Sequence, residues 1–315
     1  MTRDGRWHVD AAAAGLRLDK FLASDDRLGS QRQVLRALER GRVLVNDAEA
    51  APGDASRHLL LGDHVRVWMD RPGTAHRRGT RAARPGELPI VYQDDAIIVV
   101  NKPPGLLAVP LARRSDAPSV QDELVAHLRS RGRHRPLVVH RIDRDTSGLV
   151  VFATRADAQI RLRAQFRRHE PERVYLAVVY GHPSPAAGTW RDHLAWDQVS
   201  LIQEETRPGD PRGQEAQSDY RVVEVFRDAS LVEVRLVTGR RNQIRLQARL
   251  RGHALVGEQR YVNGPEYTRP IAFPRQALHA CRLAFRHPVD NRRLQFEAPV
   301  PRDLAGLIER LRQSR

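Results

Sequence analysis

The chain has 315 residues, of which 41% are hydrophobic, and this suits one large or two ordinary domains with a real core. Its net charge of +15 and pI of about 11.1 favour a polyanionic partner, and nucleic acid is favoured over an anionic membrane surface. No apolar run reaches the roughly 18 residues of a membrane span, no signal-peptide core is visible and a single cysteine excludes an internal disulfide, so we expect a cytoplasmic protein.

Residues 1–70 have the pattern of a small α/β module. Four short elements are predicted there: helices over 16–22 and 31–40, and strands over 43–46 and 64–68. Ser30 is placed to cap the second helix and Gly41 to end it. One face of that helix is expected to be apolar, with Val34, Leu35 and Leu38. Three arginines recur every fourth residue and share another face: Arg32, Arg36 and Arg40.

This module resembles the S4-type RNA-binding domain. The resemblance rests on Arg-Leu-Asp-Lys-Phe-Leu at 17–22, Gly-Arg-Val-Leu-Val-Asn at 41–46 and Gly-Asp-His-Val at 62–65. It implies that the arginine face contacts RNA phosphates. An ordinary solvated helix face is the alternative.

Residues 71–86 lack apolar periodicity and are rich in Pro, Gly and Arg, which predicts a flexible basic linker to a second domain over 87–315. Strands are predicted there at 90–92, 96–100, 136–139, 149–153, 173–181, 220–226 and 231–237, and helices at 119–131, 155–168, 239–251 and 303–313. Residues 186–219 are expected to hold strands and loops. Alternation along 173–181 predicts two faces, one with Val174, Leu176 and Val178, the other with Tyr175, Ala177 and Val179.

One charged loop lies between two of these predicted strands, with the sequence His140-Arg141-Ile142-Asp143-Arg144-Asp145-Thr146-Ser147-Gly148. It places several charged side chains at the ends of core strands, where burying them unpaired is costly. The loop must therefore lie at a cleft or in a tight ion-pair network. Its last four residues are of types that favour turns, so a purely structural turn is the alternative.

The loop resembles the signature of RNA pseudouridine synthases of the RluA type, with Ile142 in place of the usual Leu. Four further stretches follow the family's order: 101–106, 175–181, 238–245, and 278–280 with 285–288. The resemblance covers nearly the whole chain outside the linker and 186–213, and an S4-like module is a frequent companion. It implies an α+β fold with a mixed, largely antiparallel sheet in the catalytic domain.

The resemblance also implies a chemistry, in which the uridine C1′–N1 bond breaks, the base turns and C5 joins C1′. Asp143 matches the indispensable carboxylate, which attacks C1′ or takes a proton from C2′. Arg245 matches the arginine that keeps this carboxylate ionised and oriented. Tyr175 matches a ring that stacks on the flipped uracil, with a hydroxyl that could help to remove the C5 proton. For Tyr175 and Arg245, plain strand packing and a surface helix arginine are the alternatives.

Further residues are carried over by position. Arg141, Lys102 and Ile244 are assigned to substrate binding; Arg141 fills the space left by the flipped nucleotide, and Lys102 is also expected to buttress the loop. Supporting roles fall to Asp145, Thr146 and Asn242. Asn242 replaces the family's usual His, and we expect it to support the start of the following helix, where Asn can cap.

The sequence thus predicts isomerisation of specific uridines in structured RNA, with large-subunit ribosomal RNA as the favoured substrate and transfer RNA as the alternative. No metal-ligand spacing, Walker loop or Gly-x-Gly-x-x-Gly element appears, so no cofactor is expected. A non-catalytic RNA-binding or ribosome-assembly factor would share the charge but would not require Asp143, Tyr175 and Arg245 together. A nucleosidase or glycosidase using Asp143 is the third class. No interface signature is visible, and a monomer is the default.

Overall fold

The computed structural model describes residues 5–39, 41–68, 88–110, 117–129, 135–197, 202–262 and 270–314. It divides into two compact units, Met1–Gly79 and Thr80–Arg315. The predicted linker, 71–86, and Arg40 lie outside the described residues. No helix in the described parts is long and apolar enough to cross a membrane.

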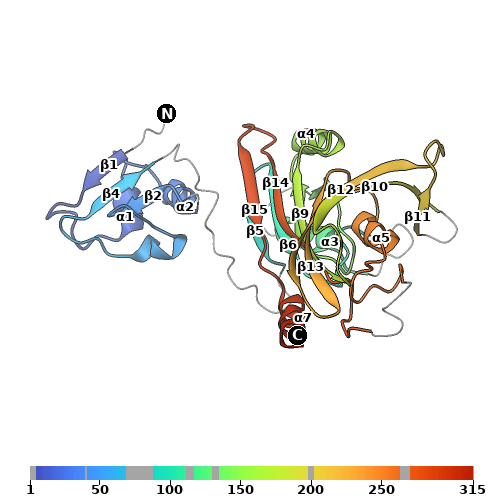
Figure 1. The fold of residues 1–315 in the computed structure, drawn as a ribbon. Coiled ribbons are helices and arrows are strands. Elements are labelled where there is room, and N and C mark those ends of the chain that lie inside the picture. Colours follow the sequence, from blue (N-terminus) through green and yellow to red (C-terminus); the bar gives the residue numbers. More distant parts are fainter. Residues whose placement is uncertain are drawn as a thin grey trace. The chain divides into compact units, whose positions relative to one another are not determined.

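The first unit is a small antiparallel sheet with helices packed against it (Figure 1). Its strand order is β1-β4-β2-β3, from β1 (Gly5–His8), β4 (His64–Val67), β2 (Val43–Val45) and β3 (Ala48–Glu49). The helices are α1 (Leu18–Leu22), α2 (Gln31–Glu39) and the short 3-10 helix η1 (Pro52–Ser56). The two predicted helices and two predicted strands are therefore present, whereas β1 and β3 were not predicted.

Helix α2 begins and ends as the sequence indicates. The Gln33 backbone N–H donates to the Ser30 hydroxyl at 3.3 Å, and Gly41 follows with a φ of 59°. Its buried residues are Val34, Ala37 and Leu38. The prediction for Leu35 is wrong: the side chain is 47% exposed, because the packed face of the helix turns toward Ala37 instead. Arg32 and Arg36 are exposed, as predicted.

The second unit is built on a large, mostly antiparallel sheet, which confirms the predicted fold class. Within the described residues its order is β11-β10-β12-β13-β9-β14-β8-β6-β5, with β15 beside β14 and β7 beside β8. The pair β14–β8 is parallel, and the other recorded pairs are antiparallel. The strands are β5 (Ile90–Gln93), β6 (Ile97–Lys102), β7 (Leu137–Val138), β8 (Ser147–Ala153), β9 (Glu172–Tyr180), β10 (Ala187–Trp196), β11 (Gln203–Thr206), β12 (Gln214–Val225), β13 (Ala229–Leu236), β14 (Leu278–Arg286) and β15 (Arg293–Glu297).

Helices cover both faces of this sheet (Figure 1). They are α3 (Val120–Arg129), α4 (Ala156–Arg167), α5 (Gln243–Leu250) and α7 (Arg302–Gln313). One core cluster joins α3 and α5 to Tyr175, Ala177 and Val179, whereas the other joins α7 to Val178 and Tyr180. The predicted alternation along β9 is thus confirmed, and it places Tyr175 on the face that carries α5.

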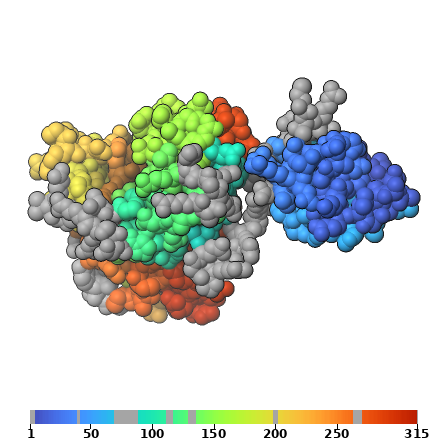
Figure 2. Space-filling model, turned by 180° about the vertical axis from the view of Figure 1, so that it is seen from behind, coloured from blue at the N-terminus to red at the C-terminus, as the bar shows by residue number. Residues whose placement is uncertain are grey.

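Helix α4 packs only one side on the sheet. Ala158 and Leu162 are fully buried, whereas Ile160 and several arginines on the other side of the helix are exposed. Figure 2 shows this outer side as the lime-green surface. Because α4 follows β8, it starts at the end of β8 away from the charged loop, and its C-terminal residues Arg163, Phe166 and Arg167 line a pocket together with that loop.

Candidate active site

The charged loop connects two paired strands, as the flanking apolar runs predict. Leu137 of β7 lies opposite Ala153 of β8, and Val138 lies opposite Phe152. The loop must pass close to the neighbouring strand β14, and Gly148 permits this. A Cβ at Gly148 would collide with the Ala280 backbone, and the φ of Gly148 is 115°, a conformation that side chains disfavour.

A pocket of about 590 Å³ opens beside the loop. Its walls come from the loop, α4, β9, the end of β13 and the start of α5. It brings together residues that the sequence singled out at positions far apart in the chain: Arg141, Asp143, Thr146, Tyr175, Asn242, Ile244 and Arg245. Lys102 and Asp145 do not line it.

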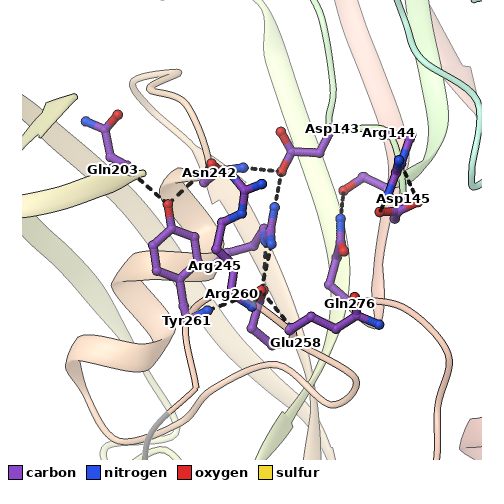
Figure 3. Close-up of polar contacts among 12 residues, drawn as sticks. Asp143, Arg144, Asp145, Gln203, Asn242, Arg245, Glu258, Arg260, Tyr261 and Gln276 are labelled. Atoms are coloured by element: carbon purple, nitrogen blue, oxygen red, sulfur yellow. Dashed lines mark hydrogen bonds and ion pairs between the residues drawn. The ribbon is translucent and has the colours of Figure 1, made fainter. Parts of the chain in front are cut away.

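Asp143 is half-buried in this pocket, and one of its oxygens is firmly held (Figure 3). Oδ2 accepts hydrogen bonds from Asn242 Nδ2 at 2.6 Å and from Arg245 Nη1 at 3.0 Å. The predicted Asp143–Arg245 pair is therefore confirmed as a contact. Oδ1 has no hydrogen-bond partner among the described residues, so one oxygen anchors the carboxylate and the other is available to a ligand.

Arg245 is itself anchored by Glu258, a residue that the sequence did not single out. Arg245 Nε donates to Glu258 Oε2 at 2.7 Å and Nη2 donates to Oε1 at 2.6 Å, a bidentate pair whose side chains are 10% and 1% exposed. Burial pulls the pKa of Arg245 down, but the hydrogen bonds and charges of Glu258 and Asp143 hold it above its ordinary value. Burial likewise raises the pKa of Glu258, but the Arg245 guanidinium and the backbone N–H groups of Arg260 and Tyr261 together bring it below its ordinary value. Both groups are therefore charged at neutral pH.

Glu258 also fixes the chain that follows it. Its Oε1 accepts backbone N–H groups from Gln259 at 3.0 Å and Arg260 at 2.9 Å. This turn brings Tyr261 beside Asn242, and the Tyr261 hydroxyl donates to Asn242 Oδ1 at 3.3 Å. The backbone N–H of Gln203 donates to the same hydroxyl at 3.0 Å.

The prediction that Asn242 caps helix α5 is wrong. Asn242 occupies the position before the helix, but its φ of 51° is left-handed and its side chain makes no capping bond. The reason is that the amide is used elsewhere, donating to Asp143 and accepting from Tyr261. Gln243 Oε1 instead accepts the Arg240 backbone N–H at 2.9 Å before the helix starts.

Lys102 supports the charged loop through hydrogen bonds to backbone oxygens. Its side chain is fully buried, and Nζ donates to the backbone oxygens of Pro103 at 2.9 Å, Leu106 at 2.8 Å and Arg144 at 2.6 Å. Burial lowers its pKa to about 7. This position lies outside the pocket, so we correct the assignment of Lys102 to substrate binding: the side chain holds the loop.

The far side of the loop is held by two residues that the sequence did not indicate. Arg275 Nη1 donates to the Asp145 backbone oxygen at 2.9 Å, and Gln276 Nε2 donates to the Thr146 hydroxyl at 3.3 Å. Thr146 is buried, in keeping with a role in the shape of the loop. Among the described residues, the Asp145 carboxylate accepts hydrogen bonds only from its exposed neighbour Arg144, at 3.2 and 3.3 Å, so the backbone of Asp145 rather than its side chain makes the long-range contact.

Two rings of the pocket are uncharged at neutral pH. Burial raises the pKa of Tyr175 to about 12, so its hydroxyl stays protonated. Burial lowers the pKa of His140 to about 3, and its ring stacks on Phe166 with centroids 4.6 Å apart. The Val151 backbone N–H donates to His140 Nε2 at 3.1 Å, which fixes the ring as part of the wall. No cluster of His, Cys, Asp or Glu able to hold a metal occurs in the described parts of the chain.

Comparisons with known proteins agree on one family. Residues 96–250 match the family model described as RNA pseudouridylate synthase. The chain is 36% identical over 309 residues to ribosomal large subunit pseudouridine synthase D of Zymomonas mobilis, covering 94% of each chain. It is 32% identical over 317 residues to ribosomal large subunit pseudouridine synthase C of Vibrio cholerae, covering 97% of this chain and 96% of that one. The structure of human RNA pseudouridylate synthase domain containing 4 shares the fold, with a TM-score of 0.59 and 21% identity over 71% of this chain and 92% of that one.

Proposed function

The chain belongs to the family of RNA pseudouridine synthases, and from this premise we propose that it converts specific uridines of large-subunit ribosomal RNA to pseudouridine. The ribosomal substrate is supported by the names of the relatives above, which share almost the full length of the chain. One observation carries the assignment of the reacting group: Asp143 lines the pocket, and two donors hold its Oδ2 while Oδ1 accepts no hydrogen bond from the described residues.

In this proposal Asp143 Oδ1 is the reacting atom. Cleavage of C1′–N1 frees the uracil, rotation brings C5 to C1′, and the new C5–C1′ bond forms as the C5 proton leaves and N1 gains one. No atom is gained or lost overall, so the reaction needs no oxidant or reductant. Attack at C1′ and removal of the C2′ proton are both open to the same oxygen. Arg245 and Asn242 hold the carboxylate in its orientation in either case.

Tyr175 and Ile244 supply apolar pocket wall for the flipped base. We assign stacking on uracil to the Tyr175 ring. Because its pKa is about 12, the hydroxyl enters the reaction as a phenol and can relay the C5 proton but not accept it as a phenolate. Arg141, exposed at the pocket edge, takes the space that the flipped nucleotide vacates.

The first unit is proposed to be an S4-like RNA-binding domain. Its support is the order of elements along 5–68 together with Arg32 and Arg36, which are exposed on one helix. The pairing of a unit that exposes arginines on one helix with a catalytic unit suits a large structured RNA, because phosphate contacts add affinity outside the pocket. The protein is proposed to act as a monomer in the cytoplasm.

The test is tritium release from RNA labelled at uridine C5, with unmodified large-subunit ribosomal RNA and a transfer RNA pool as separate substrates. The native chain should release tritium from ribosomal RNA, and Asp143→Asn should release none while still binding. Tritium release from transfer RNA alone would show that transfer RNA, and not ribosomal RNA, is the substrate. Release by Asp143→Asn would remove Asp143 from its assigned role, and free uracil as the product would indicate a glycosidase.

A further inference from the structure

A stacked Trp–Arg pair lies beside the pocket, in a part of the chain that the pocket chemistry does not use. The Arg241 guanidinium lies over the Trp196 ring, 3.8 Å from its centroid. Trp196 ends β10 and is half-buried, whereas Arg241 is exposed and sits between Arg240 and Asn242, both of which line the pocket. A cation–π contact this close restrains the guanidinium and leaves its N–H groups free to face a ligand.

Positive charge gathers at this place. Burial and then the charge of Arg141 lower the pKa of Arg241, with a further contribution from Arg260. Among the described residues, neither Arg141 nor Arg241 forms an ion pair or a side-chain hydrogen bond. The carboxylate that partly offsets them is Asp143, whose Oδ2 already serves Arg245 and Asn242.

An exposed guanidinium that is held over a ring and has no ion pair among the described residues is suited to an external anion. The paired N–H groups of a restrained guanidinium match the oxygens of a phosphate diester, because two of these oxygens can accept two parallel hydrogen bonds from one guanidinium. A nucleotide whose base enters the pocket carries a phosphate on each side of its sugar. These phosphates stay outside while the base is inside, and the exposed Arg241, next in the chain to two residues that line the pocket, lies at this edge.

We propose that Arg241, held over Trp196, binds a backbone phosphate next to the flipped uridine. The inference rests on the proposed function, because it takes the pocket ligand to be a uridine of RNA. It gives Trp196 a role in RNA affinity without contact to the reacting atoms. Trp196 and Arg241 then bind the RNA strand and take no part in the chemistry.

The experiment measures RNA binding and turnover separately. Binding is measured in an Asp143→Asn background by filter retention of a transcribed large-subunit ribosomal RNA fragment over a series of salt concentrations. Turnover is measured with native Asp143 on the same RNA. The variants are Arg241→Ala, Trp196→Ala and the conservative Trp196→Phe. The matched control is Arg227→Ala, which removes an exposed arginine in the turn between β12 and β13, away from the pocket.

Arg241→Ala is expected to raise Kd roughly tenfold, the size of one charge-assisted contact, and to lower the slope of log Kd against log salt by about one. KM should rise with it while kcat stays within about twofold, because the reacting groups are untouched. Trp196→Ala should raise Kd less, and Trp196→Phe should restore most of the loss. Arg227→Ala should leave Kd and the slope unchanged.

Two results would overturn the proposal. One is an Arg241→Ala slope and Kd equal to those of Arg227→Ala; the other is a loss of kcat with KM unchanged, which would place Arg241 in the chemistry. If the native chain binds the RNA but forms no pseudouridine, the proposed function is refuted. The slopes of log Kd against log salt would still show whether Arg241 binds a phosphate.

Discussion

Replacing Glu258 with glutamine tests whether the active site depends on a buried ion pair behind Arg245. The two side chains are 1% and 10% exposed, and two hydrogen bonds of 2.6 and 2.7 Å join them. Breaking a buried pair by removing one charge costs about 3–5 kcal/mol. Arg245 keeps Asp143 as a partner, so we expect the lower end of this range, about 3 kcal/mol. In a unit of this size, that corresponds to a fall in Tm of roughly 6–12 °C.

The same change should slow the reaction. In Glu258→Gln the Arg245 guanidinium loses its bidentate anchor, and its remaining contact is with Asp143, the carboxylate that it has to orient. Misplacement of a reacting group by about 1 Å costs on the order of a hundredfold in rate, so kcat should fall by up to that factor. The assays are thermal unfolding followed by circular dichroism and single-turnover pseudouridine formation.

Glu172→Gln is the matched control. Glu172 Oε2 lies 2.8 Å from Arg293 Nη2, but the two side chains are 29% and 67% exposed, so its loss should cost less than about 1 kcal/mol and leave kcat unchanged. Equal losses in Glu258→Gln and Glu172→Gln would refute the argument that burial makes the Arg245 pair strong. Unchanged kcat in Glu258→Gln would refute the argument that Glu258 positions Arg245.

The difference in folding stability between the native chain and Glu258→Gln should also depend on pH. Pairing lowers the pKa of Glu258 in the folded state below its ordinary value of 4.5. The stabilisation is therefore complete above that value and is lost as the pH falls through the lower folded-state pKa. The difference in stability between the native chain and Glu258→Gln should shrink on acidification, and urea unfolding at pH 7 and pH 4 measures it.

Three further changes have expected outcomes of their own. Lys102→Met should lower kcat about tenfold with little change in urea stability, because relief of charge burial offsets the lost hydrogen bonds; a large loss of stability would contradict this. Asn242→Ala removes the 2.6 Å hydrogen bond to Asp143, whereas Tyr261→Phe removes a 3.3 Å hydrogen bond to the Asn242 amide. Asn242→Ala should therefore lower kcat more than Tyr261→Phe, and the reverse order in single-turnover rates would contradict this geometry. Asp94→Asn should cost about 2 kcal/mol at pH 7, since the Asp94 pKa is lowered from 3.8 to about 2 despite burial, and this difference should shrink toward pH 3 as the stabilisation is lost; a constant difference would be the contrary result.

The framework of the site could be predicted because its signals are local. The strands on either side of the loop are short apolar runs, and their pairing follows from their closeness in sequence. The same holds for α3, where Ser119 sits before the helix and its hydroxyl accepts the Asp122 backbone N–H at 3.2 Å. Alternation along β9 correctly assigned Tyr175 to one face, because a strand has only two faces.

The supports behind the site could not be predicted, because each is a contact between distant loops. Glu258 is one acidic residue in a stretch without periodicity, and Arg275 reaches a backbone oxygen 130 positions away. Asn242 was misassigned for a related reason: its residue type suits a helix cap, but the backbone angle that prevents capping is imposed by the surrounding fold. Residue type indicates what a side chain can do, and only the tertiary structure decides which partner it finds.

The sharing of Arg245 between two carboxylates has a mechanistic consequence. In the proposed function Asp143 either bonds to C1′ or takes up a proton, and in both cases its negative charge is reduced during the reaction. An arginine held by Asp143 alone would lose its orientation at that moment. Because Glu258 fixes the guanidinium independently through two hydrogen bonds, Arg245 remains in place to receive the carboxylate when its charge returns. The arrangement keeps the site preorganised through the whole cycle, at the cost of one buried charge pair behind Asp143.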